Sequence, residues 1–326
     1  MNSHHQSHDH DHRGRGVRAM FSAAFKPHSH DAADSVDAAL ESSAAGIRAV
    51  KISLLVLLAT AAAQLLVVIF TDSVALLADT IHNFSDALTA IPLWIAFILV
   101  RRPPSKRFTY GLGRVEDVAG LFIVLTIAVS AFGAGYESIH RLLDPREISH
   151  VWVVLVAGLI GFAGNELVAL YRIRVGREIG SAALIADGLH ARTDGFTSLA
   201  VAAGAIGVMA GFPLADPIVG LLITMAILVI LRGAATEVFR RLLDGVDPVI
   251  VDEAEQSLRR TPGVQGIDSI KLRWIGHQLH AETSIVVEAT LDLTSAHQIA
   301  HAAEGALRRG VPKLSGATVH VSPAKP

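Results

Sequence analysis

Two segments of the sequence share a pattern of histidine and aspartate that could bind a metal ion. Residues 75–91 read ALLADTIHNFSDALTAI, and residues 183–199 read ALIADGLHARTDGFTSL. Each contains a His-x-x-x-Asp motif: His82 with Asp86, and His190 with Asp194. Residues four apart lie on the same face of a helix, so each segment offers one nitrogen and one oxygen ligand. Together they suit a tetrahedral zinc-type site.

The chemistry of these groups also suggests exchange of metal for protons. The chain contains no cysteine, which excludes disulfides and thiolate ligands and favours Zn²⁺ over Cu⁺. Metal binding needs neutral histidine and ionised aspartate, so it competes with protons, and imidazole titrates near neutral pH. A site that accepts either a metal ion or protons is the minimum device for exchanging one against the other.

Further charged residues flank the two motifs. Asp79 and Asp187 precede each histidine by three residues, and they could line an ion path or anchor a helix. Arg192 is expected to pair with a carboxylate such as Glu166. The alternative is that the motif residues pair with one another, or with Arg192, purely for packing. A charged residue at the centre of a membrane helix costs about 2.5–3.5 kcal/mol on insertion scales, so four at matched positions favour a metal site.

The surrounding chain is apolar enough to cross a membrane. Of its 326 residues, 51% are hydrophobic and only 18% are charged, and the mean hydropathy is +0.46. A bilayer core needs about 20 mostly apolar residues per helix. Six segments meet this requirement: roughly 50–70, 74–99, 117–140, 151–171, 181–210 and 214–235. We therefore expect a six-helix lipid-embedded domain.

The loop charges predict its orientation. The segment RRPPSKRFTYGLGR carries five Arg or Lys, whereas TDS and GFPLADP carry none. The positive-inside rule then places both termini in the cytoplasm, which agrees with an even number of helices. The net charge of −2 gives no basic excess of the kind that binds nucleic acid.

The sequence divides into three regions: residues 1–46, 47–240 and 241–326. The first is a polar tail that we expect to be disordered and to bind metal loosely. Its histidines are His4, His5, His8, His10, His12, His28 and His30. A purification tag is the alternative, but Asp, Ser and Gln interrupt the histidines here. The second region holds the membrane helices. The third alternates helical and strand patterns in the order α-β-β-α-β, which predicts a small cytoplasmic α/β domain.

Over roughly residues 48–323 the chain resembles the cation diffusion facilitator family of divalent-metal/proton antiporters. The paired motifs carry the resemblance, together with FTYGLGRVED, LADPIVGLLI and LLDGVDP. The resemblance implies a transporter rather than an enzyme, located in the cell membrane. It also implies a homodimer with a metallochaperone-like, ferredoxin-like cytoplasmic domain. The transport site would be His82, Asp86, His190 and Asp194, which prefer Zn²⁺ and also admit Cd²⁺ or Co²⁺.

The resemblance also implies roles outside the membrane site. Arg114 would pair with a carboxylate near the end of the sixth helix, and Glu237 is the candidate. The cytoplasmic domain would bind at least one regulatory metal ion. The candidate ligands are His277, His280, His297 and His320, with His301 nearby. His320 is followed by Val and Ser rather than a carboxylate, which argues against a full two-metal site.

Three other functions compete with an antiporter. An intramembrane metallohydrolase commonly uses HExxH, and the sequence contains none. A metal channel needs a weak, multi-site pore rather than one four-ligand trap. A membrane-anchored metal sensor would bind the ion without moving it, and transport measurements distinguish it.

Overall fold

The computed structural model describes residues 30–71, 90–144, 151–212 and 214–325. The chain divides into two compact units, Met1–Ala38 and Ala39–Pro326. The second unit holds the membrane helices and the cytoplasmic domain, and the account below concerns that unit. The predicted ligands His82 and Asp86 lie outside the described residues, as does Asp79.

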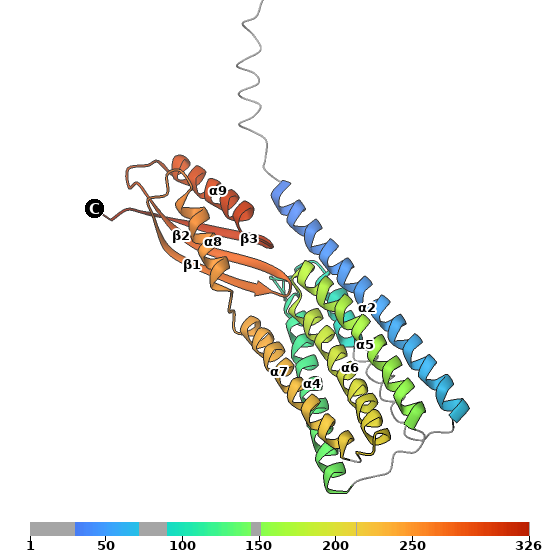
Figure 1. Ribbon diagram of the computed structural model, residues 1–326. Coiled ribbons are helices and arrows are strands. Elements are labelled where there is room, and N and C mark those ends of the chain that lie inside the picture. Colours follow the sequence, from blue (N-terminus) through green and yellow to red (C-terminus); the bar gives the residue numbers. More distant parts are fainter. Residues whose placement is uncertain (1–29, 72–89, 145–150, 213, 326) are drawn as a thin grey trace, which may run out of the picture. The chain divides into compact units, whose positions relative to one another are not determined.

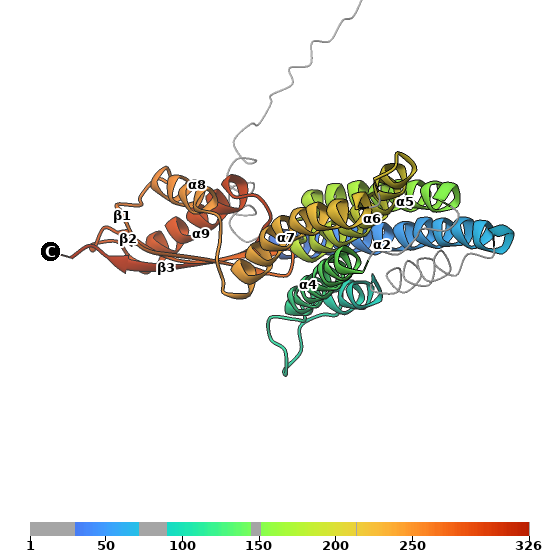
Figure 2. The same ribbon diagram turned by 60° about the horizontal axis from the view of Figure 1, so that its bottom comes forward.

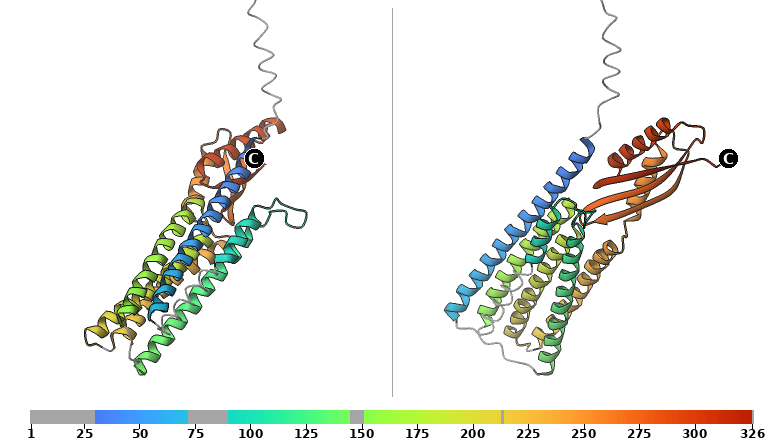
Figure 3. Two further views of the ribbon diagram at one scale, coloured as in Figure 1. Left: turned by 90° about the vertical axis from the view of Figure 1, so that its right-hand side faces the viewer. Right: turned by 180° about the vertical axis from the view of Figure 1, so that it is seen from behind.

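Long apolar helices form most of the described chain. They are α2 (His30–Thr71), α4 (Arg114–Leu143), α5 (Val151–Ile179), α6 (Ala182–Met209) and α7 (Ala215–Leu242). A shorter apolar helix covers Ala90–Val100. Helices α4 to α7 run side by side (Figure 1; Figure 3). Helices therefore occupy the predicted membrane segments wherever the chain is described, and residues 74–89 of the second segment lie outside the described residues.

Helix α2 corrects the expectation for the N-terminal tail. Residues 30–46 were expected to be disordered, but α2 begins at His30. Alanine recurs through this stretch and favours helix. Extending an existing helix also avoids the unfavourable nucleation step, so the membrane helix continues into the polar segment.

Four described helices are long and apolar enough to cross a membrane: Leu40–Leu66, α4, α5 and α7. Their outer faces carry large apolar side chains, and Val129, Phe132 and Val229 are 73%, 78% and 72% exposed. Such faces suit contact with lipid tails. Backbone N–H and C=O groups in lipid must be hydrogen-bonded within the protein, and a helix meets this requirement. Helix α6 does not belong to this set, since Asp187, Arg192 and Asp194 interrupt its apolar sequence.

Close glycine contacts hold α5 against α6. A Cβ added to Gly188 would lie 2.8 Å from Ile173 Cγ1, and one added to Gly158 would lie 2.8 Å from the Ser198 carbonyl oxygen. Small residues permit this approach in membranes, where packing replaces the hydrophobic effect as the main attraction. Because α4, α5 and α7 all contact α6, its polar face is shielded.

The C-terminal region forms a two-layer α/β domain (Figure 2). Its elements are α8 (Pro248–Arg259), β1 (Gly266–Ile275), β2 (Gln278–Val287), α9 (Leu293–Gly310) and β3 (Leu314–Pro323). The sheet order is β1-β2-β3, with β1 and β2 antiparallel and β2 and β3 parallel. The predicted order α-β-β-α-β is confirmed, and so is the predicted class of membrane helices followed by a small α/β domain.

Alternation along β2 determines which face carries the core of this domain. Leu279, Ile285 and Val287 are buried and pack with Leu258 of α8 and Leu307 of α9. The intervening side chains point to the opposite face of the sheet. Helix α9 begins at a capping carboxylate, because Asp292 accepts a hydrogen bond from the Ser295 backbone N–H at 2.7 Å. This bond holds the pKa of Asp292 below its usual value.

Leu258→Ala should lower the free energy of unfolding of the cytoplasmic domain by about 2–5 kcal/mol, because the side chain is completely buried. Val249→Ala, on the same helix but 61% exposed, should change it by less than about 1 kcal/mol. Urea titration of the chain in detergent, followed by Trp274 fluorescence after replacing Trp94 and Trp152 with Phe, measures both. Equal losses would contradict the assigned core.

Candidate metal-transport site

The ligand-bearing helix α6 begins at a well-formed cap. Gly180 adopts φ +80°, a left-handed conformation that glycine accepts readily. Ser181 then accepts a hydrogen bond from the Leu184 backbone N–H at 3.0 Å. At 1.5 Å per residue, His190 lies roughly 12 Å along the helix from Ala182. The cap therefore fixes the depth at which the motif enters the bundle.

His190 and Asp194 lie together on the inner face of α6, as the sequence spacing predicted. His190 Nδ1 is 3.6 Å from Asp194 Oδ1, and the two side chains are 2% and 7% exposed. Thr193, between them, donates its hydroxyl to the His190 carbonyl oxygen at 2.6 Å. The structure thus places one imidazole and one carboxylate side by side in a shielded position.

The other half of the predicted tetrad lies outside the described residues. Among residues that the structure describes, no group of three or more His, Asp or Glu side chains could hold a metal ion. This agrees with α6 supplying two ligands only. His82 and Asp86 would have to supply the remaining two.

Neutral polar side chains are buried where α2, α5 and α6 meet. Gln64 is fully buried and donates to the Ala157 carbonyl oxygen at 3.3 Å. A Cβ on Gly161 would lie 2.8 Å from Ser198 Oγ and 3.0 Å from Gln64 Nε2. Gly161 therefore lets polar groups of three helices approach one another. Gln64 was not predicted as part of the site, although it is a lone amide within the apolar segment ISLLVLLATAAAQLLVVIF.

Asp187, whose role the sequence left open between ion path and helix anchor, pairs with Arg172 of α5. Asp187 Oδ2 is 3.0 Å from Arg172 Nη1, and the two side chains are 0% and 2% exposed. The Arg172 stem fits beside Gly188, where a Cβ would lie 3.1 Å from Arg172 Cβ. This ion pair supports a role for Asp187 as a helix anchor rather than as part of an ion path. Arg172 lies just beyond the predicted fourth membrane segment, 151–171, but α5 continues to Ile179 and includes it.

Arg192 pairs with Glu166, which confirms that prediction. Two hydrogen bonds join them, from Arg192 Nη2 and Nε to the carboxylate oxygens at 2.7 and 3.1 Å. Two parallel bonds of this kind fix the geometry of both side chains. The Arg192 guanidinium is therefore paired with Glu166 of α5.

The predicted pair of Arg114 with Glu237 does not form within one protomer. Arg114 instead pairs with Asp244 and donates to the Arg241 carbonyl oxygen at 2.9 Å. Glu237 accepts from Arg241, one helical turn away, at 3.1 Å. The reason is local: α7 ends at Leu242, and Asp244 takes φ +59° in the following turn, which brings its carboxylate to Arg114.

The structure does not bring the cytoplasmic histidines together within one protomer. His277 is buried with Nδ1 2.7 Å from Glu116 Oε2, and His280 lies 3.2 Å from Ser315 Oγ. His297 faces His301, with Nε2 atoms 3.1 Å apart, and His320 is exposed on β3 beside Ser284. A shared site of His277, His280, His297 and His320 is therefore not formed within one chain.

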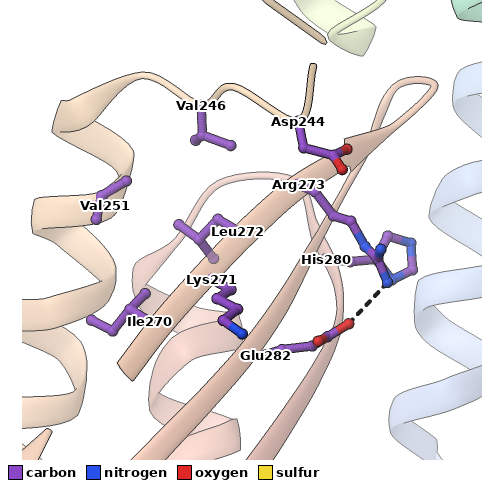
Figure 4. A pocket seen from close by; sticks show the side chains of 9 residues that line it. All are labelled: Asp244, Val246, Val251, Ile270, Lys271, Leu272, Arg273, His280 and Glu282. Atoms are coloured by element: carbon purple, nitrogen blue, oxygen red, sulfur yellow. Dashed lines mark hydrogen bonds and ion pairs between the residues drawn. The ribbon is translucent and has the colours of Figure 1, made fainter. Parts of the chain in front are cut away.

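His280 belongs to a pocket of about 450 Å³ on the sheet (Figure 4). Arg273 and Lys271 also line it, and Arg273 donates to Glu282 at 2.9 Å. Burial lowers the pKa of His280, and the charge of Arg273 lowers it further. Two carboxylates, Asp244 and Glu282, line the pocket with these two cationic side chains, so its charges balance.

Comparisons with known proteins agree with these features. The model of the cation efflux transmembrane domain matches residues 50–243, and that of the cation efflux cytoplasmic domain matches 246–324. A probable cation efflux system protein of Mycobacterium tuberculosis is 65% identical over 98% of this chain and 96% of its own length. The manganese efflux system protein MneS of Bacillus subtilis is 24% identical over 78% of this chain and 87% of its own. A solved MamM C-terminal domain aligns with a TM-score of 0.24 at 20% identity, covering 24% of this chain and 98% of that domain.

Replacing either partner of the Arg172–Asp187 pair should destabilise the helix bundle strongly. Arg172→Gln or Asp187→Asn alone leaves one buried charge unpaired, at a cost of about 3–5 kcal/mol. The double variant Arg172→Gln/Asp187→Asn removes both charges and should recover most of that loss. Thermal unfolding of all four proteins in one detergent gives the coupling. Additive losses would show that the two side chains do not interact.

Proposed function

Because the chain belongs to the cation efflux family and is a membrane transporter rather than an enzyme, we propose that it exports Zn²⁺ from the cytoplasm in exchange for protons. One observation carries the proposal. His190 and Asp194 lie 3.6 Å apart, shielded inside a bundle of membrane helices. An imidazole nitrogen and a carboxylate oxygen are both ligands that Zn²⁺ accepts, and here they lie on one face of α6.

The proposed site is completed by the second copy of the motif. His82 and Asp86 add a second nitrogen and a second oxygen, which gives the four-ligand set that Zn²⁺ prefers. Two imidazoles distinguish this set from the all-oxygen sites suited to Mn²⁺, the metal that gives MneS its name. Cd²⁺ and Co²⁺ are secondary substrates.

Protons complete the cycle at the same atoms. From the cytoplasmic side, neutral His190 and ionised Asp194 take up the metal. When the site opens to the other side, protons compete for the imidazole and carboxylate, and the metal leaves. A site that faces the two sides alternately then couples proton entry to metal exit. Gln64 and Ser198 supply neutral hydrogen-bonding groups near the helix junction without competing for charge.

The working unit is proposed to be a homodimer in the cell membrane, with both termini in the cytoplasm. The cytoplasmic domain matches the family's cytoplasmic domain along nearly its whole length. The charge of the loops gives the orientation. Since the four cytoplasmic histidines lie apart in one protomer, any regulatory metal there would need ligands from both protomers.

Zinc uptake into proteoliposomes tests the proposal. With the cytoplasmic face outward and an acidic lumen, zinc should enter while the lumen becomes more alkaline. His190→Ala should reduce both signals to the protein-free background, because it removes one of the four ligands. Asp252→Asn, at an exposed position of α8, serves as the control and should transport normally. Wild-type liposomes that move no zinc under any pH gradient would refute the antiporter.

Ligand identity should also control selectivity. His82→Asp exchanges a nitrogen for an oxygen ligand and should raise the ratio of Cd²⁺ to Zn²⁺ transport several-fold. The two rates are measured in the same liposome preparation with an indicator for each metal. A ratio equal to the wild-type value would show that His82 does not contact the ion.

A further inference from the structure

The turn between β1 and β2 inserts into the end of the helix bundle. We call residues 274–277 the hairpin tip. Gly276 adopts φ +61°, and a Cβ there would lie 2.8 Å from the Gly113 carbonyl oxygen. A Cβ on Gly113 would in turn lie 2.9 Å from the Ile275 carbonyl oxygen. Two glycines thus let the backbone of the tip touch the backbone that begins α4.

His277 and Glu116 form the centre of this contact. The imidazole Nδ1 is 2.7 Å from Glu116 Oε2, and each side chain is only 2% exposed. Asp117, also buried, accepts a hydrogen bond from the Gly276 backbone N–H. The tip therefore supplies a hydrogen-bonding partner to each of two adjacent buried carboxylates, and Asp117 also lies 3.5 Å from Arg114 Nη1.

The same tip contacts the helix that follows the first motif. The His277 ring lies 6.4 Å from that of Phe97, tilted by 50°. Phe97 is fully buried in the helix Ala90–Val100. This helix belongs to the predicted membrane segment that includes His82 and Asp86.

Arg241 of α7 connects the tip to the start of α6. Its Nη1 donates to the carbonyl oxygens of Gly276 at 3.2 Å and Gly180 at 2.7 Å. Its guanidinium lies over the Trp274 ring, 4.4 Å from the centroid. Gly180 directly precedes the cap of the helix that carries His190. A second contact lies nearby, where Lys313 at the start of β3 donates to the Arg177 carbonyl oxygen at 2.9 Å.

These contacts place one turn of the cytoplasmic domain against the ends of both ligand-bearing segments. We propose that the hairpin tip is a positioning element for transport, through which the cytoplasmic domain controls how readily the two ligand-bearing helices move relative to each other. Gly276 and His277 act through Phe97 and Gly180 and do not bind the transported ion. Because the contact is close-packed and includes buried charged groups, a change at the tip is transmitted to the backbone at the start of α4 and to Gly180. This inference rests on the proposed transport function.

Gly276→Ala tests the contact between the hairpin tip and the start of α4 directly. Its Cβ would collide with the Gly113 carbonyl oxygen, and φ +61° disfavours alanine. The variant should lower the maximal zinc transport rate at least tenfold and change the KM less than twofold, since the ligands are untouched. Gly266→Ala, at the start of β1, is the matched control, because the added Cβ would lie 3.6 Å from its nearest contact, Val286 Cβ. It should transport at the wild-type rate.

His277 gives an independent measurement in case Gly276→Ala does not fold. His277→Gln keeps a donor for Glu116 and should retain most of the maximal rate, whereas His277→Ala should lose it with the KM unchanged. A wild-type rate in Gly276→Ala or His277→Ala overturns the proposal, and so does a loss that appears mainly in the KM. Failure of the wild-type protein to move zinc refutes the proposed function. If the wild-type protein moves zinc and Gly276→Ala or His277→Ala transports at the same rate, only the role of the tip is refuted.

Discussion

The structure depends on the pairing of charges that are buried in an apolar helix bundle. Arg172 and Asp187 are almost completely shielded, and each is tolerated because the other lies 3.0 Å away. Arg192 and Glu166 neutralise each other's charge in the same way at a half-buried position. These two pairs account for every charged residue of α6 except Asp194. Asp194 lies one helical turn from the imidazole of His190, with 3.6 Å between Nδ1 and Oδ1, and this arrangement suits the proposed exchange of metal for protons.

The glycines of α5 and α6 make this charge pairing possible. Without a side chain at Gly188, the guanidinium of Arg172 reaches Asp187 across a very short helix separation. The same closeness excludes water from the face that carries His190 and Asp194. Packing and electrostatics therefore reinforce each other along one interface. A substitution that separates the helices would expose the site and unpair the charges together.

Much of this arrangement could be predicted from the sequence, because it follows from periodicity. Apolar runs predicted the helices, and alternation of apolar and polar residues predicted the strands. The four-residue spacing predicted that His190 and Asp194 share one face of a helix. The pair of Arg192 with Glu166 was also predictable, since few carboxylates lie near enough in the membrane segments. Asp244 was missed as the partner of Arg114, since a left-handed turn after α7 carries it there. No local pattern encodes such a turn.

His277 shows a second limit of sequence reasoning. Among the cytoplasmic histidines it looked like a metal ligand, but its position depends on a hairpin meeting a helix 161 residues away in the chain. Contacts of this separation arise from tertiary packing alone. Glu116 lies in the FTYGLGRVED segment, but no local pattern there predicts a contact with the turn that contains Gly276. The same packing joins the cytoplasmic domain to the helices that carry the proposed site.

The central claim is that a buried site of two imidazoles and two carboxylates holds the transported ion. Zinc K-edge X-ray absorption of the full chain in detergent, loaded with one equivalent of zinc, tests it most directly. The account predicts four ligands at about 2.0–2.1 Å, including two imidazoles, and loss of one imidazole in His190→Ala. Six oxygen ligands, or a spectrum that His190→Ala does not change, would contradict it.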